Sequence, residues 1–457
     1  MKAGLTTVGI LASLTPNFGC RIAGSAPDLA VWADLPRGSK SRGAGPRGRL
    51  EGVFMSPMLL YVTSAVNRAR PCALMGVGLG IVLALSAWAG AATAQQRART
   101  IDTVSGMPPV VDPNNLYSET QADKLSPAVA GALPRIYVPN RQSGDVTVID
   151  PNTFKVVDRF PVGLHPQHVV PSWDLRTLWV TNNAEGRADG SLTPIDPTTG
   201  KPGKTIPADD PYNMYFMPDG HSAIVVAEAL KRLDFRDPQT MALQSSLSVP
   251  GCAGINHGDF SIDGRFAIFT CEYQGSLVKI DLVNRKVLGY LQLAKGGMPQ
   301  DIRISPDGQT FFVADMKAGG VFLIDGERFT EVGFIKTGVG AHGLYPSRDA
   351  TKLYVANRGS SHVYGPPRGK GNVSVIDFVT RGIVATWTIP GGGSPDMGNV
   401  SADGKVLWLS GRYDDVVYAI DTTTGQVRTI PVGKEPHGLT VWPQPGRYSL
   451  GHTGNMR

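Results

Sequence analysis

The fold is decided by the stretch DIRISPDGQTFFVADMKAGGVFLID, which occupies residues 301–325. An alternating apolar run ends at a turn containing Asp307-Gly308, and a second alternating run follows it. Asp-Gly between two such runs is typical of a tight β-hairpin. A third run closes the stretch with an Ile-Asp pair, and a fourth follows at about 330–337. The stretch therefore predicts a four-stranded antiparallel unit.

This unit recurs along the chain. An aliphatic residue followed by Asp appears seven times, at spacings between 38 and 52 residues. The seven pairs end in Asp150, Asp196, Asp234, Asp281, Asp325, Asp377 and Asp421. Four strands in a unit of about 40–45 residues are typical of a β-propeller blade. A single blade cannot bury both of its faces, so the blades must pack around a ring.

The two ends of the repeat array complete each other. The first unit begins at 135–138 with a second strand and has no innermost strand of its own. The segment at 436–442 is an innermost strand with no second strand after it. Joining the two removes an exposed sheet edge. We therefore predict an all-β, seven-bladed propeller at 135–446, closed by a C-terminal strand that completes the first blade.

Some of the strands carry a family resemblance. The runs Tyr-Val-Ala-Asn at 354–357 and Leu-Trp-Val-Thr-Asn at 178–182 resemble the bacterial and archaeal family named for its Tyr-Val-Thr-Asn (YVTN) repeat. The resemblance covers nearly all of 135–446 and implies a propeller in the cell envelope, without fixing a function. The haem-binding propeller domains of dissimilatory nitrite reductases are similar more distantly, in architecture.

The first part of the chain resembles an export signal. We interpret 1–54 as an untranslated or disordered leader and 55–94 as a signal peptide, with a basic segment, an apolar run and a small-residue exit. An uncleaved membrane anchor is the alternative, because the apolar run approaches spanning length. Residues 95–134 form a lead-in that is either an ordered strap or a flexible tail, and 447–457 form a C-terminal tail. We therefore expect a periplasmic or secreted protein.

Composition argues against one class of partner. The formal net charge is +6, but many basic residues crowd the first hundred positions. A basic leader before a near-neutral domain is not the electrostatic footprint of a nucleic-acid-binding protein. We expect no nucleic acid, membrane contact only through an uncleaved anchor, and a monomer.

Two cysteines, Cys252 and Cys271, follow the leader. They fall just before the first strand and at the end of the second strand of one unit, and these ends meet in an antiparallel pair. A disulfide between them is expected in an oxidising compartment. Two buried free thiols are the alternative.

Four of the eight histidines in the chain occupy the start of predicted innermost strands, where a propeller channel opens. They are His168, His257, His342 and His437. Carboxylates at equivalent positions are Asp301 and Asp396. Imidazole and carboxylate groups converging on a channel suit copper or another transition metal, and less readily a tetrapyrrole. A solvated channel whose polar residues bind only water and nearby carbonyls is the alternative.

A second pattern lies at the end of the second strand in three neighbouring blades. Arg141, Arg358 and Arg412 follow these strands. Three guanidinium groups on one side of the mouth suit an anion such as a carboxylate or phosphate. Pairing with loop carboxylates is the alternative interpretation.

No catalytic motif is recognised, and the catalytic residues are unknown. The sequence contains no nucleophile elbow, phosphate-binding glycine loop, zinc-protease helix motif or haem-attachment motif. The leading hypothesis is a non-catalytic propeller that binds a small molecule, anion, metal or protein at a histidine-rich mouth. A periplasmic redox enzyme or cofactor-assembly protein is the first alternative, and an inert scaffold is the second.

Overall fold

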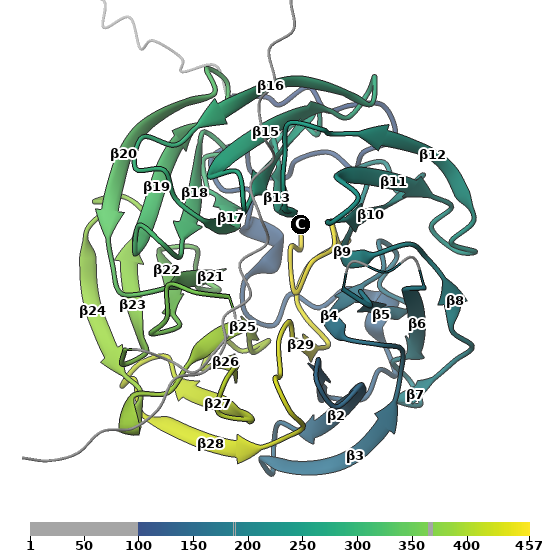
Figure 1. Ribbon diagram of the computed structural model, residues 1–457, viewed down its shortest axis with the longest axis vertical. Coiled ribbons are helices and arrows are strands. Elements are labelled where there is room, and N and C mark those ends of the chain that lie inside the picture. Colours follow the sequence, from purple (N-terminus) through teal and green to yellow (C-terminus); the bar gives the residue numbers. More distant parts are fainter. Residues whose placement is uncertain (1–98, 186, 188, 364–368) are drawn as a thin grey trace, which may run out of the picture. The chain divides into compact units, whose positions relative to one another are not determined.

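A computed structural model describes residues 99–185, 187, 189–363 and 369–457. The leader and signal peptide expected at 1–54 and 55–94 lie outside these residues. The described chain forms seven sheets arranged as blades around a central axis (Figure 1). The predicted seven-bladed, all-β fold is confirmed.

Each blade has its innermost strand at the channel and its outermost strand at the rim. Blade 1 contains β29 (Thr440–Trp442), β1 (Arg135–Asn140), β2 (Asp145–Asp150) and β3 (Lys155–Pro161). Blade 2 contains β4 (Pro166–Pro171), β5 (Leu178–Asn182), β6 (Ser191–Asp196) and a split outer strand, β7 (Lys201–Pro202) with β8 (Ile206–Pro207). Blade 3 contains β9 (Pro211–Phe216), β10 (Ala223–Ala227), β11 (Arg232–Arg236) and β12 (Leu243–Ser248). Blade 4 contains β13 (Ile255–Phe260), β14 (Phe266–Cys271), β15 (Ser276–Asp281) and β16 (Lys286–Gln292).

The remaining three blades repeat the same order. Blade 5 contains β17 (Pro299–Ile304), β18 (Thr310–Asp315), β19 (Gly320–Asp325) and β20 (Thr330–Lys336). Blade 6 contains β21 (Ala341–Pro346), β22 (Lys352–Asn357), β23 (Asn372–Asp377) and β24 (Ile383–Thr388). Blade 7 contains β25 (Pro395–Val400), β26 (Val406–Gly411), β27 (Val416–Asp421) and β28 (Val427–Pro431). A short 3-10 helix, η3 (Pro390–Gly392), connects blades 6 and 7.

Burial along a blade explains its sequence pattern. In blade 5 every residue of β17 and β18 is buried, whereas β20 contains only exposed and partly buried residues. The inner strands pack against neighbouring blades on both faces, so they tolerate continuous apolar runs. Apolar clusters join adjacent blades, as where Phe260 of blade 4 packs with Phe235 of blade 3. The core is therefore a ring of interfaces between blades.

The closure of the ring follows the predicted scheme. Strand β29 pairs antiparallel with β1, with Ile136 opposite Val441. An isolated bridge between Asn140 and Pro436 extends this contact toward the channel mouth. Blade 1 is therefore built from both ends of the repeat array, as expected.

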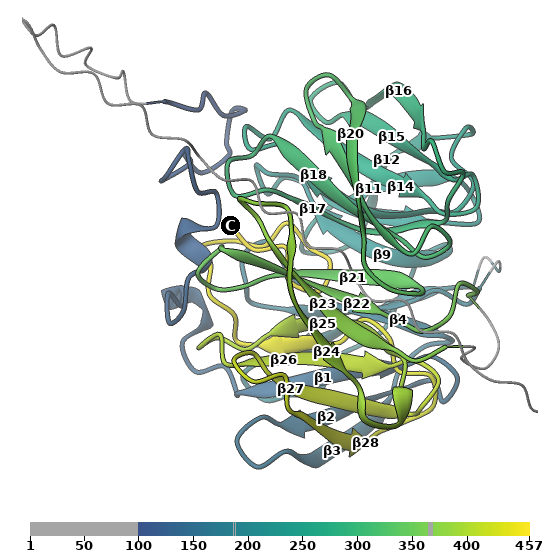
Figure 2. The same ribbon diagram turned by 90° about the vertical axis from the view of Figure 1, so that its left-hand side faces the viewer.

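Residues 99–134 of the lead-in form a strap against the propeller. It contains η1 (Ser118–Thr120) and η2 (Pro127–Val129). Its backbone bonds to the turns between the first and second strands of three blades, at Asp263, Pro306 and Ala402. Figure 2 shows the strap along one face of the propeller, on the same side as the chain's C-terminus.

The segment after β29 also has defined structure. Residues 447–457 do not extend away from the propeller as a tail, and Tyr448, Leu450 and Met456 are each at most 2% exposed. The Leu450 carbonyl accepts from the backbone N–H of Phe216 on β9, at 3.0 Å. Figure 1 places the C-terminus near the centre of the ring. This segment and the strap close one end of the channel, which we call the closed end.

A disulfide joins Cys252 and Cys271, the pair that the sequence favours. Both residues are buried against the apolar cluster between blades 3 and 4. Among the described residues, no helix has the length and apolar character needed to cross a membrane.

Candidate functional site

The innermost strands carry the expected histidines into the channel. His168 lies on β4, His257 on β13 and His342 on β21, while His437 precedes β29. The innermost strands of blades 2 to 7 each pair irregularly with the next strand at these positions. A β-bulge inserts an extra residue and interrupts the alternation of faces along a strand. Side chains at adjacent strand positions can therefore reach the same channel.

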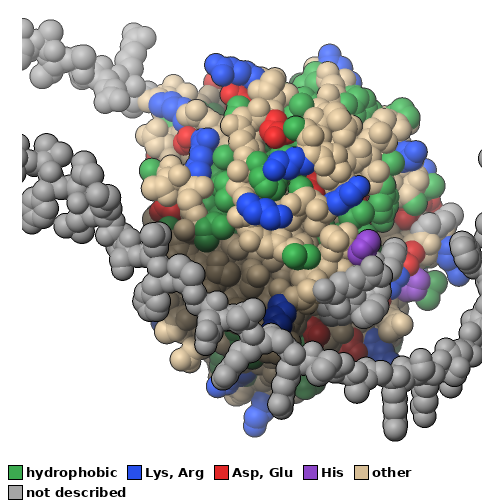
Figure 3. Space-filling view, turned by 60° about the vertical axis from the view of Figure 1, so that its left-hand side comes forward, with side chains coloured by type: hydrophobic (Ala, Val, Ile, Leu, Met, Phe, Trp, Pro, Cys, Tyr) green, Lys and Arg blue, Asp and Glu red, His purple; other side chains and the backbone are tan. Residues whose placement is uncertain are grey.

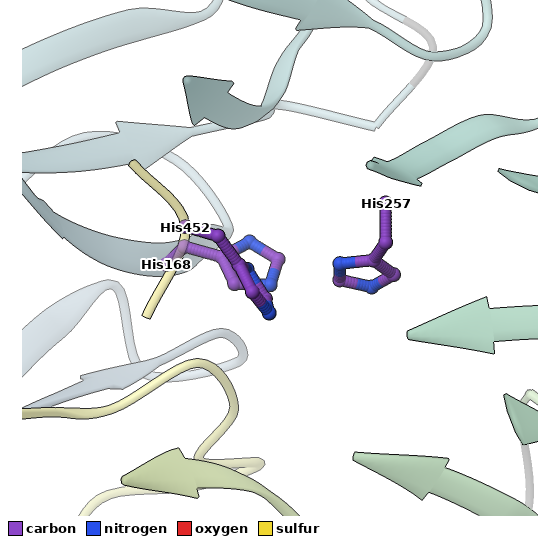
Figure 4. Close-up of side chains that lie close together, drawn as sticks. All are labelled: His168, His257 and His452. Atoms are coloured by element: carbon purple, nitrogen blue, oxygen red, sulfur yellow. The ribbon is translucent and has the colours of Figure 1, made fainter. Parts of the chain in front are cut away.

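A fifth imidazole comes from His452, in the segment after β29. Ring nitrogens of His168, His257 and His452 lie within 4.8 Å of one another, and all three side chains are buried. Figure 4 shows His168 and His452 together on one side, with His257 facing them from the other. The ring of His437 lies 4.9 Å from that of His168, and 5.7 Å from that of His342. Five imidazoles thus form one compact cluster.

The hydrogen bonds of the cluster leave ring nitrogens free. His168 Nδ1 lies 2.9 Å from the backbone oxygen of Tyr212. Because a carbonyl only accepts, Nδ1 carries the proton and Nε2 keeps its lone pair. Within the described chain, Nε2 of His168 and Nε2 of His257 are buried with no hydrogen-bond partner. Native structures leave few buried polar atoms in this condition, so these two nitrogens require an explanation.

Asn213 on β9 orients two of the rings. Its amide nitrogen donates to Nδ1 of His257 at 3.1 Å and to Nδ1 of His452 at 2.9 Å, so Nε2 carries the proton in both neutral rings. On the other side of its ring, His452 Nε2 lies 3.3 Å from the carboxylate of Asp301. These contacts fix the direction in which both imidazoles face the channel.

The five imidazoles are neutral at neutral pH. Burial lowers the pKa of His168 to about 4. Burial also lowers the pKa of His257, His342, His437 and His452 well below the ordinary value of 6.5. Neutral imidazole is the form that binds transition metals. His168 presents a lone pair at Nε2, whereas metal binding by His257 and His452 requires their Nδ1 atoms to exchange the Asn213 hydrogen bond for the ion.

Asp396 on β25 connects two of the histidines to an arginine. Its carboxylate lies 3.0 Å from Nδ1 of His342 and 2.8 Å from Nδ1 of His437, and accepts a 2.7 Å bond from Arg358. Burial is the largest influence and opposes ionisation, but the charges of Arg358, His342 and Arg412 together outweigh it, so the pKa of Asp396 is lowered. His437 Nε2 in turn lies 3.3 Å from the hydroxyl of Tyr212.

The channel widens beyond the histidines into a cavity of 490 Å³ at the end opposite the closed end. We call this the open end. Polar and charged side chains from most blades line the cavity. They include Gln167, Asn183, Glu185, Tyr212, Glu228, Lys231, Glu272, Tyr273, Gln300, His342, Arg358, Arg412 and His437. Figure 3 shows basic side chains scattered among acidic and uncharged ones on the outer face that it draws.

The three predicted arginines lie in different surroundings. Arg358 and Arg412 both line the cavity. Arg141 is held in ion pairs with Glu185 and Glu435, in keeping with the alternative interpretation for that residue. Arg358 is paired with Asp396, as described above. Arg412 is 3% exposed, and its Nε and Nη1 have no hydrogen-bond partner within the described chain.

Asp301, the other predicted carboxylate, lies away from the cavity. It accepts from the backbone N–H of Leu344 at 2.9 Å and pairs with Arg303 at 3.1 Å. Its contact with His452 links it to the histidine cluster from the closed end of the channel. Asp301 therefore supports the cluster and does not line the cavity.

The sequence interpretation missed three residues of the site. His452 follows the last strand, so the strand alignment did not include it. Glu228 and Glu272 directly follow β10 and β14, in the same register as the arginines after β22 and β26. An alignment of the position directly after the second strand in all seven blades would have found both carboxyl groups.

The chain is similar to several known propellers. Its curated relatives include the uncharacterized proteins YncE of Salmonella typhi and Salmonella typhimurium. Each is 23% identical over 285 residues, which is 59% of this chain and 75% of the relative.

Solved structures share the fold. The periplasmic gluconolactonase PpgL of Pseudomonas aeruginosa matches with a TM-score of 0.56 and 19% identity, over 68% of this chain and 99% of that one. The dihydro-heme d1 dehydrogenase NirN matches with a TM-score of 0.51 and 16% identity, over 67% of this chain and 75% of that one. At these identities the matches establish architecture and leave chemistry open.

The family assignment rests on a wider match. Residues 93–445 match the family described as YNCE-like beta-propeller, and this range contains all seven blades. The chain belongs to the YncE-like β-propeller family.

Proposed function

We propose that this YncE-like propeller is an exported, monomeric protein that binds a transition metal ion in its channel. His168, His257 and His452 supply the imidazole ligands. The proposal is carried by one observation: one ring nitrogen from each of three buried imidazoles lies within 4.8 Å of the others, and Nε2 of His168 and of His257 has no partner within the described chain. Imidazole donors suit copper, zinc, nickel or iron.

The surrounding contacts support this assignment. Metal-binding histidines usually donate their second ring N–H to a carbonyl or carboxylate, which fixes the tautomer. His168 has this arrangement with the carbonyl of Tyr212. His342 and His437 have it with Asp396, and Nε2 of His437 is in turn in contact with the Tyr212 hydroxyl.

Export is supported separately. The disulfide between Cys252 and Cys271 fits an oxidising compartment. The structural relative PpgL is described as periplasmic. The interpretation of 55–94 as a signal peptide, made from sequence, agrees with both.

Elemental analysis and the visible spectrum of the purified protein test the metal site. We expect one transition metal ion per chain after loading with Cu²⁺, Zn²⁺ or Co²⁺, and at least tenfold weaker binding in His168→Asn, His257→Asn and His452→Asn. The exposed His221 lies outside the channel, and His221→Asn is the matched control.

Two outcomes would overturn the proposal. The first is a protein that takes up none of these ions at micromolar concentration. The second is equal uptake by the three variants and the control. A His342→Asn/His437→Asn double variant locates the ion. If this double variant loses the ion while the three single variants keep it, the ion binds beside Asp396. A Soret band would instead indicate a tetrapyrrole.

A second candidate function is general acid–base catalysis in the cavity. Asp396, His437 and Tyr212 form a continuous hydrogen-bonded chain, and both His437 and Tyr212 line the cavity. Such a chain can transfer a proton at the Tyr212 hydroxyl. We propose hydrolysis of a sugar lactone as the first reaction to assay, because PpgL is described as a gluconolactonase.

A pH-stat assay with a gluconolactone tests this candidate. Catalysis requires a rate above the spontaneous one that falls about a hundredfold in Tyr212→Phe, the order expected for one acid–base group. A rate equal to the spontaneous one rejects it.

A further inference from the structure

The residues that directly follow the second strand of each blade occupy seven equivalent positions around the open end. In blade order from 1 to 7, they are Arg141, Asn183, Glu228, Glu272, Met316, Arg358 and Arg412. The acidic positions are in blades 3 and 4, and the basic positions are in blades 6, 7 and 1. Charge is therefore separated across the channel mouth by the order of the blades.

On the basic side, Arg412 is the group available to a ligand. It lines the cavity, is 3% exposed, and has two guanidinium nitrogens without a hydrogen-bond partner in the described residues. Its neighbour Arg358 is already paired with Asp396 at 2.7 Å. A buried arginine without a carboxylate is unfavourable unless a bound anion completes its bonds. A carboxylate fits the fork of a guanidinium in a bidentate manner.

On the acidic side, two carboxyl groups are available. Glu228 Oε1 has no hydrogen-bond partner among the described residues, and Glu272 accepts a 2.7 Å bond from Asn256. Burial and then the Glu272 carboxylate raise the pKa of Glu228 well above its ordinary value, and burial raises that of Glu272. A cation placed between the two groups would relieve both the burial cost and the repulsion.

We infer that the cavity binds a small zwitterion of the amino-acid type. Its carboxylate pairs with Arg412, and its ammonium group lies between Glu228 and Glu272. Tyr212 lines the same cavity as Glu228, Glu272 and Arg412. The cavity of 490 Å³ has room for a side chain as well as the two charged groups. The inference goes beyond the metal site and does not depend on it.

Other charges at the cavity do not change this assignment. Glu185 also lines the cavity but is paired with Arg141, and Lys231 lines it as an exposed side chain. Neither is a buried charge that lacks a partner. The ligand selectivity therefore follows from Arg412 and the Glu228–Glu272 pair.

Calorimetric titration of the purified protein, with a chelator present to remove metal, tests the inference. The probes are L-alanine, L-leucine, L-glutamine and L-phenylalanine, with L-lactate and n-butylamine as molecules that carry only one of the two charged ends. We expect at least one amino acid to bind at least tenfold more tightly than either single-ended molecule. Arg412→Gln and Glu228→Gln should each weaken that binding by ten- to a hundredfold.

The controls separate binding from folding. Arg265→Gln and Glu327→Gln remove exposed charges away from the cavity and should bind as the parent does. Arg412→Lys keeps the charge without the fork and should give an intermediate affinity. The melting temperature of each variant shows that it is folded.

The inference is overturned if no amino acid binds at millimolar concentration. It is also overturned if lactate or butylamine binds as tightly as the best amino acid, or if folded Arg412→Gln binds unchanged. These results would leave the metal proposal intact, because that proposal is read out by metal content alone.

Discussion

Buried arginines at the two ends of the channel differ in whether a carboxylate is paired with them. At the closed end, Arg457 pairs with Asp259 at 2.7 Å, and Arg303 pairs with Asp301 at 3.1 Å. At the open end, Arg412 is as deeply buried as these arginines, but two of its nitrogens have no partner in the described chain. These two closed-end arginines are thus paired with carboxylates, whereas Arg412 at the open end is in no ion pair among the described residues.

This difference separates residues that hold the ring together from residues that are available for binding. Buried charges are tolerated where they are paired and hydrogen-bonded, and are costly where they are not. An unpaired buried charge in a cavity lowers the stability of the protein. Such charges are typical of functional sites. We therefore expect variants at the two ends to change stability in opposite ways.

Removing residues 447–457 should have the largest effect. The deletion removes the buried side chains of Tyr448, Leu450 and Met456 and exposes the apolar residues beneath them. Burial of each of these three side chains stabilises the fold by roughly 1.5–3 kcal/mol. It also leaves Asp259 buried without Arg457, at a cost of about 3–5 kcal/mol. The total approaches the whole stability of a typical domain. Thermal melting should show no cooperative transition for the deletion variant.

His452→Asn is the control for this deletion. It removes the imidazole and keeps the segment, so it should melt near the parent temperature while losing metal. A cooperative, parent-like melt of the deletion variant would show that the segment is not part of the folded core.

Single arginine substitutions compare the two ends directly. Arg457→Gln leaves the buried Asp259 carboxylate without its guanidinium and should cost about 3 kcal/mol. Arg412→Gln removes an unpaired charge and should leave the stability of the ligand-free protein unchanged or raise it. Denaturant unfolding of the two variants side by side measures this. Equal destabilisation by both substitutions would contradict the distinction between the ends.

The stability of the protein should fall in mildly acidic solution because of the buried histidines. For His168 the pKa is about 4 in the folded protein and about 6.5 in the unfolded chain. The unfolded chain therefore takes up the proton first, and stability is lost as pH falls from 6.5 toward 4. By pH 5 this amounts to about 2 kcal/mol for one such histidine.

Comparing the parent with His168→Asn isolates this contribution, since Asn retains a donor for the carbonyl of Tyr212. Raised pKa values of Asp301, Glu228 and Glu272 act in the opposite direction, but they are common to both proteins. With metal removed, the variant should lose about 2 kcal/mol less between pH 7 and pH 5. Identical pH dependence would mean that His168 is not held neutral by burial.

Tyr117→Phe should have the smallest effect of the series. The Tyr117 hydroxyl, in the strap, donates a 2.7 Å hydrogen bond to the carbonyl of Ile304 on β17. Losing one such bond costs about 1 kcal/mol. A change in melting temperature of a few degrees or less, with no change in metal binding, is expected. A loss of metal would connect the strap to the histidine cluster and contradict this expectation.

The fold could be predicted from the repeat because turn residues and apolar alternation are local properties of the sequence. Asp307-Gly308 and the Ile-Asp pairs mark hairpins in the sequence itself, and strand 436–442 could be matched to the first blade by what each lacked. The lead-in has no such period, so whether it was a strap depended on contacts with turns far away in the chain.

The site was predictable only where it followed the repeat. His168, His257, His342 and His437 could be aligned on strand starts, and the structure brings their rings into one cluster. His452 reaches the same cluster from a non-repeating segment, so no alignment of blades could place it. The pairing of Arg141 and the isolation of Arg412 depend on side-chain packing, which the register alone does not determine.

The most direct test of the account is an anomalous difference map from crystals of the protein loaded with Cu²⁺, recorded at the copper edge. The account predicts a single strong peak in the channel, bonded to His168, His257 and His452 at about 2.0–2.1 Å, the distance usual for metal–imidazole bonds. A map with no peak in the channel, or with copper bound only at surface sites such as His221, would contradict it.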